Sequence, residues 1–119
     1  MKILLVEDHE FLAQITRSQL REIHDHEVAH AFTAAAALEL ASQAKFDLVL
    51  LDLNLPDLNG YSLAAKLREL DGFDDTVIVT LTGIGNHTDP AKAAQSGVDA
   101  QFTKPMDFSD LPNIKRKTK

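Results

Sequence analysis

The stretch "LVLLDLNLPDLNG", residues 48–60, begins with apolar residues that suit a strand buried on both faces. An acid, Asp52, follows this run directly, and Pro56 and Gly60 then mark a turn. A carboxylate is costly to bury without a partner. We therefore ask which groups lie beside the Asp52 carboxylate at the end of this strand.

Similar short runs rich in Val, Ile and Leu recur along the chain, and each is followed by a longer stretch with helical spacing. The runs predict strands at residues 3–6, 27–32, 46–52, 76–82 and 100–103. Each of the stretches predicts a helix, and the first has an apolar stripe at Leu12, Ile15, Leu20 and Ile23. The later helices are predicted from a Thr33 cap to residue 44, over residues 60–70, over residues 88–96, and from about residue 108. Strand and helix units in alternation indicate an α/β fold with parallel strands.

The composition limits the possible functions. A chain of 119 residues with 45% hydrophobic residues predicts one globular domain over 1–119. The beginning "MKILLVEDHE" has only four apolar residues in a row before its acids, so neither a signal peptide nor a membrane span is expected, and a cytoplasmic location is predicted. The sequence has no cysteine, which excludes disulfides and thiolate metal sites.

The net charge of −6 disfavours nucleic acid as a partner, because binding to phosphates needs a cationic face. The basic cluster at residues 115–119 is interpreted as the solvated end of the last helix, where cations suit the helix dipole. A binding patch is the alternative reading of this cluster.

Polar residues follow several predicted strands at their carboxyl ends, where sheets of this kind bind ligands. They are Glu7 and Asp8, Asp52, Thr82 and Gly83, and Thr103 and Lys104. If the first and third strands are neighbours, three carboxylates converge, and because like charges repel, a cation is expected among them. Mg²⁺ suits such a site because it prefers carboxylate and phosphate oxygens.

The remaining groups at the strand ends suit a phosphoryl group. Thr82 offers a hydroxyl, Gly83 leaves room beside it, and Lys104 offers an ammonium. A carboxylate such as Asp52 can itself be the nucleophile and form an aspartyl phosphate. Each residue alone also has an ordinary reading: acids solvate strand ends, threonine fills β positions, and lysines lie on surfaces.

Four segments, "LLVEDHE", "DLVLLDLNLPDLNG", "VTLTG" and "FTKP", together resemble the motifs of the receiver domain of two-component response regulators. They occur in the family's order and spacing across essentially the whole chain. The resemblance implies a flavodoxin-like (βα)5 fold, doubly wound, with strand order 2-1-3-4-5. It also implies a role in a two-component system or phosphorelay, in which a phosphoryl group on the domain switches partner binding.

The resemblance further implies a role for each site residue. Asp52 would accept the phosphoryl group from a histidine kinase or a histidine phosphotransfer protein. Mg²⁺ would be held by Asp8, Asp52 and the backbone carbonyl of Asn54, with Glu7 acting through water.

Thr82 and Lys104 would each contact a phosphoryl oxygen, with Gly83 beside them. Such a domain catalyses only its own phosphorylation and dephosphorylation and is not otherwise an enzyme. A downstream protein would bind through the fourth helix, the fifth strand and the fifth helix.

One position departs from the family pattern. An aromatic residue commonly lies three positions before the lysine and couples to the threonine as a switch, but here that position is Gln101. The neighbouring Phe102 points to the opposite face of a strand and is predicted to pack in the core. Coupling between Thr82 and Gln101 is therefore open. The segment "LTGIGNHTD" is also similar to receivers attached to hybrid histidine kinases.

Two other functions compete with the phosphoacceptor. An aspartyl phosphatase uses a second acid two residues after its nucleophile, where this chain has Asn54. A receiver-like interaction module that works without phosphorylation is disfavoured by the intact Asp8, Asp52, Thr82 and Lys104, but Gln101 keeps it open.

The remaining polar residues of interest are expected to have ordinary roles. Asp57 is predicted to shape the turn after Pro56. Loop or surface roles are predicted for His9, His24, His26, His30 and His87, of which His9 alone follows the acidic pair.

Overall fold

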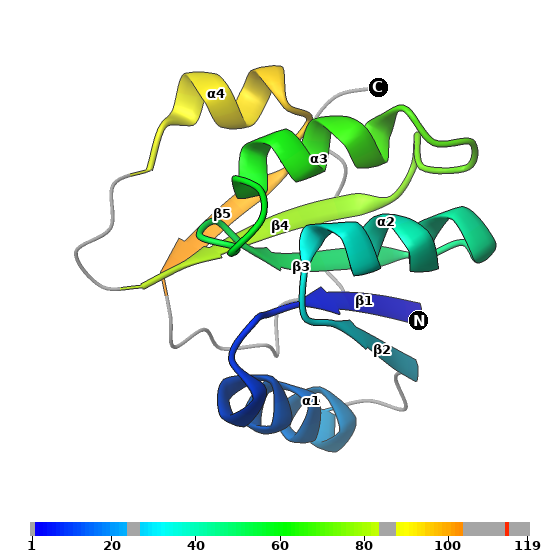
Figure 1. Ribbon diagram of the computed structural model, residues 1–119, viewed down its shortest axis with the longest axis vertical. Helices are drawn as coiled ribbons and strands as arrows, with labels where there is room; N and C mark the ends of the chain where they lie inside the picture. Colours follow the sequence, from blue (N-terminus) through cyan, green and yellow to red (C-terminus); the bar gives the residue numbers. More distant parts are fainter. Residues whose placement is uncertain (1, 24–26, 84–87, 104–113, 115–119) are drawn as a thin grey trace.

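Five parallel strands form one sheet in the computed structural model, which describes residues 2–23, 27–83, 88–103 and 114. The strands are β1 Lys2–Val6, β2 Glu27–Ala31, β3 Leu48–Asp52, β4 Val77–Thr82 and β5 Ala100–Thr103. Their order is β2-β1-β3-β4-β5, and their carboxyl ends lie along one edge of the sheet (Figure 1). The predicted doubly wound parallel sheet is therefore confirmed.

Four described helices cover the two faces of the sheet. They are α1 Glu10–Ile23, α2 Ala34–Gln43, α3 Gly60–Arg68 and α4 Pro90–Gln95. α1 lies on one face, and α2, α3 and α4 lie on the other (Figure 1). Thr33 caps α2 as predicted, and α3 ends slightly earlier than predicted. The predicted last helix lies outside the described residues.

The central strand β3 is buried on both faces. Its residues Leu48, Val49, Leu50 and Leu51 are at most 2% exposed, and alternate side chains pack into the two core layers. Each buried leucine contributes about 1.5–3 kcal/mol of transfer free energy. A shift of this strand along its axis would draw the carboxylate of Asp52 into the apolar core, which is costly. Burial of the strand thus fixes where its last residue lies.

The apolar stripe predicted for α1 is only partly correct. Leu20 is buried, together with Ala13, whereas Leu12 is 40% and Ile15 is 41% exposed. The inner face of the helix follows the spacing of positions 13 and 20, with half-buried residues at 16 and 17 between them. Leu12 and Ile15 therefore lie on a solvent-facing apolar surface.

The core position predicted for Phe102 is wrong, because its side chain is 36% exposed. The alternation on which the prediction was based does hold, since Gln101 pairs with Thr80 and bonds to it on the other face of the sheet. β5 is an edge strand, and Phe102 lies near its carboxyl end, where the strand is less covered than the centre of the sheet.

Among the residues that the structure describes, the helices are too short or too polar for any of them to cross a lipid bilayer.

Candidate functional site

Three carboxylates meet at the carboxyl ends of β1 and β3. Val6 pairs with Leu51 in the parallel ladder, so the next residues, Glu7 and Asp52, leave neighbouring strands side by side. Carboxylate oxygens of Glu7, Asp8 and Asp52 all lie within 4.8 Å of one another. Glu7 is buried, Asp52 is half-buried and Asp8 is exposed, so the cluster opens to solvent on one side. The sequence predicted this convergence.

The backbone of Glu7 is held from the edge strand β2. Its N–H donates to the carbonyl of Ala31 at 3.0 Å, and its carbonyl accepts a hydrogen bond from Nε2 of His30 at 2.8 Å. The His30 ring packs against Phe32, with 4.1 Å between ring centroids. The loop or surface role predicted for His30 is wrong, because His30 is half-buried in β2 and the pairing of β2 with β1 brings it beside Glu7.

The chain turns back tightly after Asp52. Oδ1 of Asp52 accepts from the Asn54 N–H at 3.0 Å, and the Gly60 N–H donates to the Leu53 carbonyl at 2.8 Å. A Cβ atom at Gly60 would lie 2.7 Å from the backbone oxygen of Asp52, which is closer than real Cβ contacts come. Glycine is therefore required for α3 to begin against the end of β3.

The β3–α3 loop is tied to α2 by Asp57. The Asp57 carboxylate accepts from the Ala34 and Ala35 N–H groups at 2.9 and 3.0 Å, while Thr33 caps the N–H of Ala36. The hydrogen bonds from Ala34 and Ala35 lower the pKa of Asp57 below the ordinary value of an aspartate. The expectation that Asp57 shapes the turn misses this second role, since a cap supplied from a distant loop has no local sequence signal.

The end of β4 lies on the other side of Asp52. The Leu53 N–H donates to the Leu81 carbonyl at 3.3 Å. Thr82, the residue after Leu81, is 1% exposed. Gly83 comes next and is half-buried. Lys104, the predicted ammonium, lies outside the described residues, so its place at the site stays a prediction.

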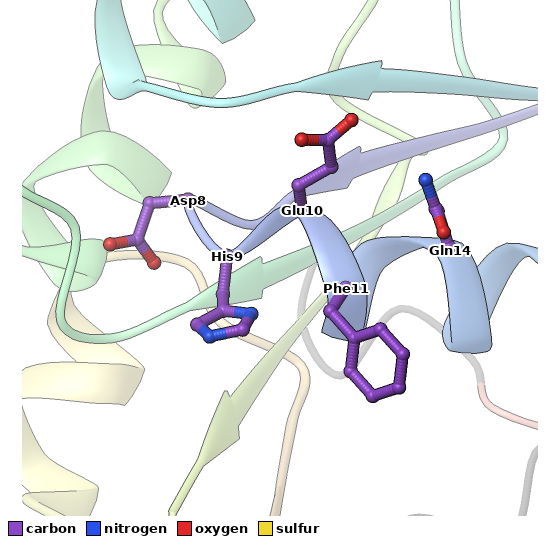
Figure 2. A pocket seen from close by; sticks show the side chains of 5 residues that line it. All are labelled: Asp8, His9, Glu10, Phe11 and Gln14. Carbon is purple, nitrogen blue, oxygen red and sulfur yellow. The ribbon is translucent and has the colours of Figure 1, made fainter.

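An open pocket of about 520 Å³ adjoins the acidic cluster (Figure 2). It is lined by Asp8, His9, Glu10, Phe11 and Gln14. Nδ1 of His9 accepts from the Leu12 N–H at 3.5 Å at the beginning of α1, and the Phe11 ring beside it is 65% exposed. His9 thus lies next to the site, as its position after the acidic pair suggested.

The donor set of the cluster fits a hard divalent cation. All three side chains offer carboxylate oxygens, and the described cluster contains no thiolate or imidazole ligand. Oxygen ligands of this kind suit Mg²⁺ or Ca²⁺ rather than the softer transition metals. Glu7 is buried beside the half-buried Asp52, so the two carboxylates meet where little water separates them.

Comparison with known proteins gives the class of protein. The family of response regulator receiver domains matches residues 3–115. The transcriptional regulatory protein SrrA of Staphylococcus aureus is 34% identical over 105 residues, which are 88% of this chain and 42% of that protein. The chain thus spans less than half the length of the curated relatives it matches.

Solved structures agree with this match. A receiver domain from Methylobacillus flagellatus has a TM-score of 0.84 at 28% identity, covering 96% of this chain and 94% of that one. The receiver domain of a sensor histidine kinase from Pseudomonas aeruginosa PAO1, solved with a magnesium ion in its active-site cleft, has a TM-score of 0.81 at 27% identity, covering 95% and 92%. The chain belongs to the response regulator receiver domain family.

Proposed function

We propose that Asp52 accepts a phosphoryl group from a phosphohistidine, and that this changes which proteins the domain binds. The observation that carries the proposal is the convergence of Glu7, Asp8 and Asp52 at the open end of a buried strand. The proposed domain takes in the whole chain, residues 1–119, and acts in the cytoplasm.

The chemical step is a transfer between two side chains. A carboxylate oxygen of Asp52 attacks the phosphorus, an oxygen–phosphorus bond forms, and the phosphorus–nitrogen bond to the donor imidazole breaks. The imidazole leaves and takes up a proton from solvent. Such transfer depends mainly on positioning and on stabilising the charge of the phosphoryl oxygens. The domain catalyses only this step and the later hydrolysis of its own aspartyl phosphate.

The metal that fits this chemistry is Mg²⁺. Asp8, Asp52 and the backbone carbonyl of Asn54 would hold it, and Glu7 would act through water. A bound Mg²⁺ supplies positive charge beside the phosphoryl oxygens. The Asn54 N–H donates to Asp52, and this bond orients the acceptor carboxylate relative to the turn. The magnesium ion in the receiver domain from Pseudomonas aeruginosa supports this assignment.

The remaining contacts to the phosphoryl group are assigned to β4 and to the residue after β5. Thr82 would donate its hydroxyl to one phosphoryl oxygen, and Gly83 would leave room beside it. Lys104 would pair with another oxygen. The carboxyl end of β4 lies beside that of β3, which places the Thr82 backbone next to the acceptor strand.

The phosphoryl donor is proposed to be a histidine kinase or a histidine phosphotransfer protein. The exposed apolar side chains Phe11, Leu12 and Ile15 on α1 support docking of a protein donor, because Phe11 lines the pocket that Asp8 also lines. A downstream protein would bind the α4–β5 face and the predicted helix after it. Neither nucleic acid nor membrane is proposed as a direct partner.

Phosphorylation can be tested by incubating the protein with Mg²⁺ and acetyl phosphate and measuring the intact mass. We expect the mass of one added phosphoryl group in the wild type and none in Asp52→Asn. Asp47→Asn is the matched control, because Asp47 is exposed and directly precedes the same strand at its opposite end. Equal modification of wild type and Asp52→Asn would contradict Asp52 as the acceptor. Modification of neither would contradict the proposal and favour a module that works without phosphorylation.

A further inference from the structure

Gln101, at the position where the family commonly has an aromatic residue, is bonded to an aromatic residue from another element. The hydroxyl of Tyr61, in the first turn of α3, donates to Oε1 of Gln101 at 2.6 Å. The Thr80 hydroxyl donates to the same oxygen at 3.2 Å. Tyr61 is 7% and Thr80 is 0% exposed, so this network is largely shielded from water.

The same tyrosine also holds the beginning of α4. Its hydroxyl oxygen accepts from the Asp89 N–H at 2.9 Å, and the Asp89 carboxylate in turn caps α4 through the Lys92 N–H at 3.1 Å. α4 has six residues, of which only Ala93 is buried. Because this helix has so little buried surface, the hydrogen bond from the Asp89 N–H to Tyr61 helps to fix its beginning.

The network begins close to the acceptor. Tyr61 follows Gly60, which packs against the backbone of Asp52. Thr80 and Thr82 are two residues apart in β4, so their side chains lie on the same face of the sheet. Thr80, which is bonded to Gln101, is thus the preceding residue of β4 on the face that carries the Thr82 side chain.

Two residues of the network line hollows that flank α4. Tyr61 lines a hollow of about 350 Å³ between α3 and α4. Gln101 lines a smaller hollow of about 120 Å³ between α4 and β5. Tyr61 and Gln101 thus each line one of the two hollows that flank α4.

We propose that Tyr61 and Gln101 form a hydrogen-bonded clasp that replaces the missing aromatic switch, and that phosphorylation of Asp52 opens it and releases the beginning of α4. This inference rests on the proposed function. Thr82 is 1% exposed in the clasped arrangement. In the proposed switch, Thr82 moves toward the phosphoryl group, and Thr80 moves with it away from Gln101. Phosphorylation can open the clasp only if the phosphoryl group is bound more tightly in the open state.

The sequence offers a direct probe, because Tyr61 is the only tyrosine and there is no tryptophan. With ring-labelled tyrosine, a single ring signal reports the clasp, and amide exchange of Asp89 reports release of α4. On addition of Mg²⁺ and beryllofluoride we expect the Tyr61 signal to shift and the Asp89 amide to exchange at least about ten-fold faster, within the usual range of allosteric coupling.

Variants test the direction of the coupling. Tyr61→Phe keeps the ring and removes only the hydroxyl, and Gln101→Met removes the acceptor at nearly constant length. In these variants no clasp has to be broken when beryllofluoride binds. If binding opens the clasp, loss of the clasp must strengthen binding, so each variant should bind beryllofluoride at least about five-fold more tightly. The double variant should bind no more tightly than either single variant, since both changes break one interaction.

Thr76→Val is the matched control. It also removes a buried hydroxyl hydrogen bond, from Thr76 to the carbonyl of Phe46 at 2.7 Å, but at the opposite edge of the sheet. Its beryllofluoride affinity should equal that of the wild type even if its stability falls.

The possible results separate the clasp from the function on which it rests. Shifts at Asp52 and Asn54 with an unchanged Tyr61 signal and Asp89 amide would overturn the clasp and leave the phosphoacceptor standing. Unchanged or weaker beryllofluoride affinity in Tyr61→Phe would also overturn it. Absence of any shift at the strand ends would overturn the proposed function itself.

Discussion

The sheet has an amino edge, where its strands begin, and a carboxyl edge, where they end. The two edges arrange charged side chains in opposite ways. At the amino ends of β4 and β5, Nη2 of Arg68 lies 2.8 Å from Oδ2 of Asp99, whose side chain is 0% exposed. At the carboxyl ends of β1 and β3, Glu7, Asp8 and Asp52 bring three carboxylates within 4.8 Å of one another. The first edge buries opposite charges together, whereas the second gathers like charges at a position that is open to solvent.

The ion pair at the amino edge is part of a set of hydrogen bonds that connects three elements. Arg68 also donates to the backbone carbonyls of Phe73, Thr76 and Gly97, which lie in the segments leading into β4 and β5. Oδ2 of Asp99 accepts a second bond from the Ile78 N–H at 2.9 Å. These bonds join α3 to both strands. The charges of the amino edge are thus held in bonds within the fold, whereas Asp8 at the carboxyl edge is exposed to solvent.

The largest expected effect comes from Arg68→Ala at the amino edge. Removing Arg68 takes the guanidinium away from the buried Asp99 carboxylate, so the free energy of unfolding should fall by about 3–5 kcal/mol. Urea denaturation measures it. Arg21→Ala, at an exposed arginine in the last turn of α1, should change the free energy by less than about 0.5 kcal/mol. A loss for Arg68→Ala as small as that of an exposed ion pair, below about 1 kcal/mol, would contradict the structural role.

Gly60→Ala tests the carboxyl edge. The added methyl group would meet the backbone of Asp52 and Leu53, each at 2.7 Å. Overpacking of this kind should lower the free energy of unfolding by about 1–3 kcal/mol. Because Asp52 and the turn must shift, Mg²⁺ affinity measured by calorimetry should fall as well.

Ser62→Ala, at an exposed position of the same helical turn, is the control and should leave both quantities nearly unchanged. Loss of stability in Gly60→Ala with full Mg²⁺ affinity would show that the turn does not position the Asp52 carboxylate.

A smaller, pH-dependent effect is expected for Asp57→Asn, because an amide has one acceptor oxygen where the carboxylate has two. The pKa of Asp57 is lowered from 3.8 by its bonds to Ala34 and Ala35, so the carboxylate stabilises the fold above that pH. This stabilisation is lost as the pH falls through the lowered pKa. Thermal unfolding should therefore show a gap between wild type and variant at neutral pH that narrows in acid. A gap that stays constant down to low pH would contradict the capping role.

Much of the fold and of the acidic cluster could be predicted from local sequence. The apolar run before Asp52 predicted a buried strand, and the parallel sheet then predicted that its end would lie beside Glu7 and Asp8. Burial of the central strand makes this prediction strong, because few other registers keep the carboxylate out of the core.

What could not be predicted depends on contacts between distant elements. The cap from Asp57 to α2 and the bond from Tyr61 to Gln101 join residues 22 to 40 positions apart. Phe102 followed the predicted alternation but lies on an edge strand, where the direction of a side chain does not determine its burial. Period and propensity carry no information about such pairings.

The most direct test of the contrast between the two edges is to map amide shifts on addition of Mg²⁺ and beryllofluoride. We expect the largest shifts at Asp8, Asp52, Asn54 and Thr82, with little change at Asp99, and loss of the response in Asp52→Asn. Shifts that are absent from the carboxyl edge, or that persist unchanged in Asp52→Asn, would contradict the claim that this edge is the phosphoacceptor site.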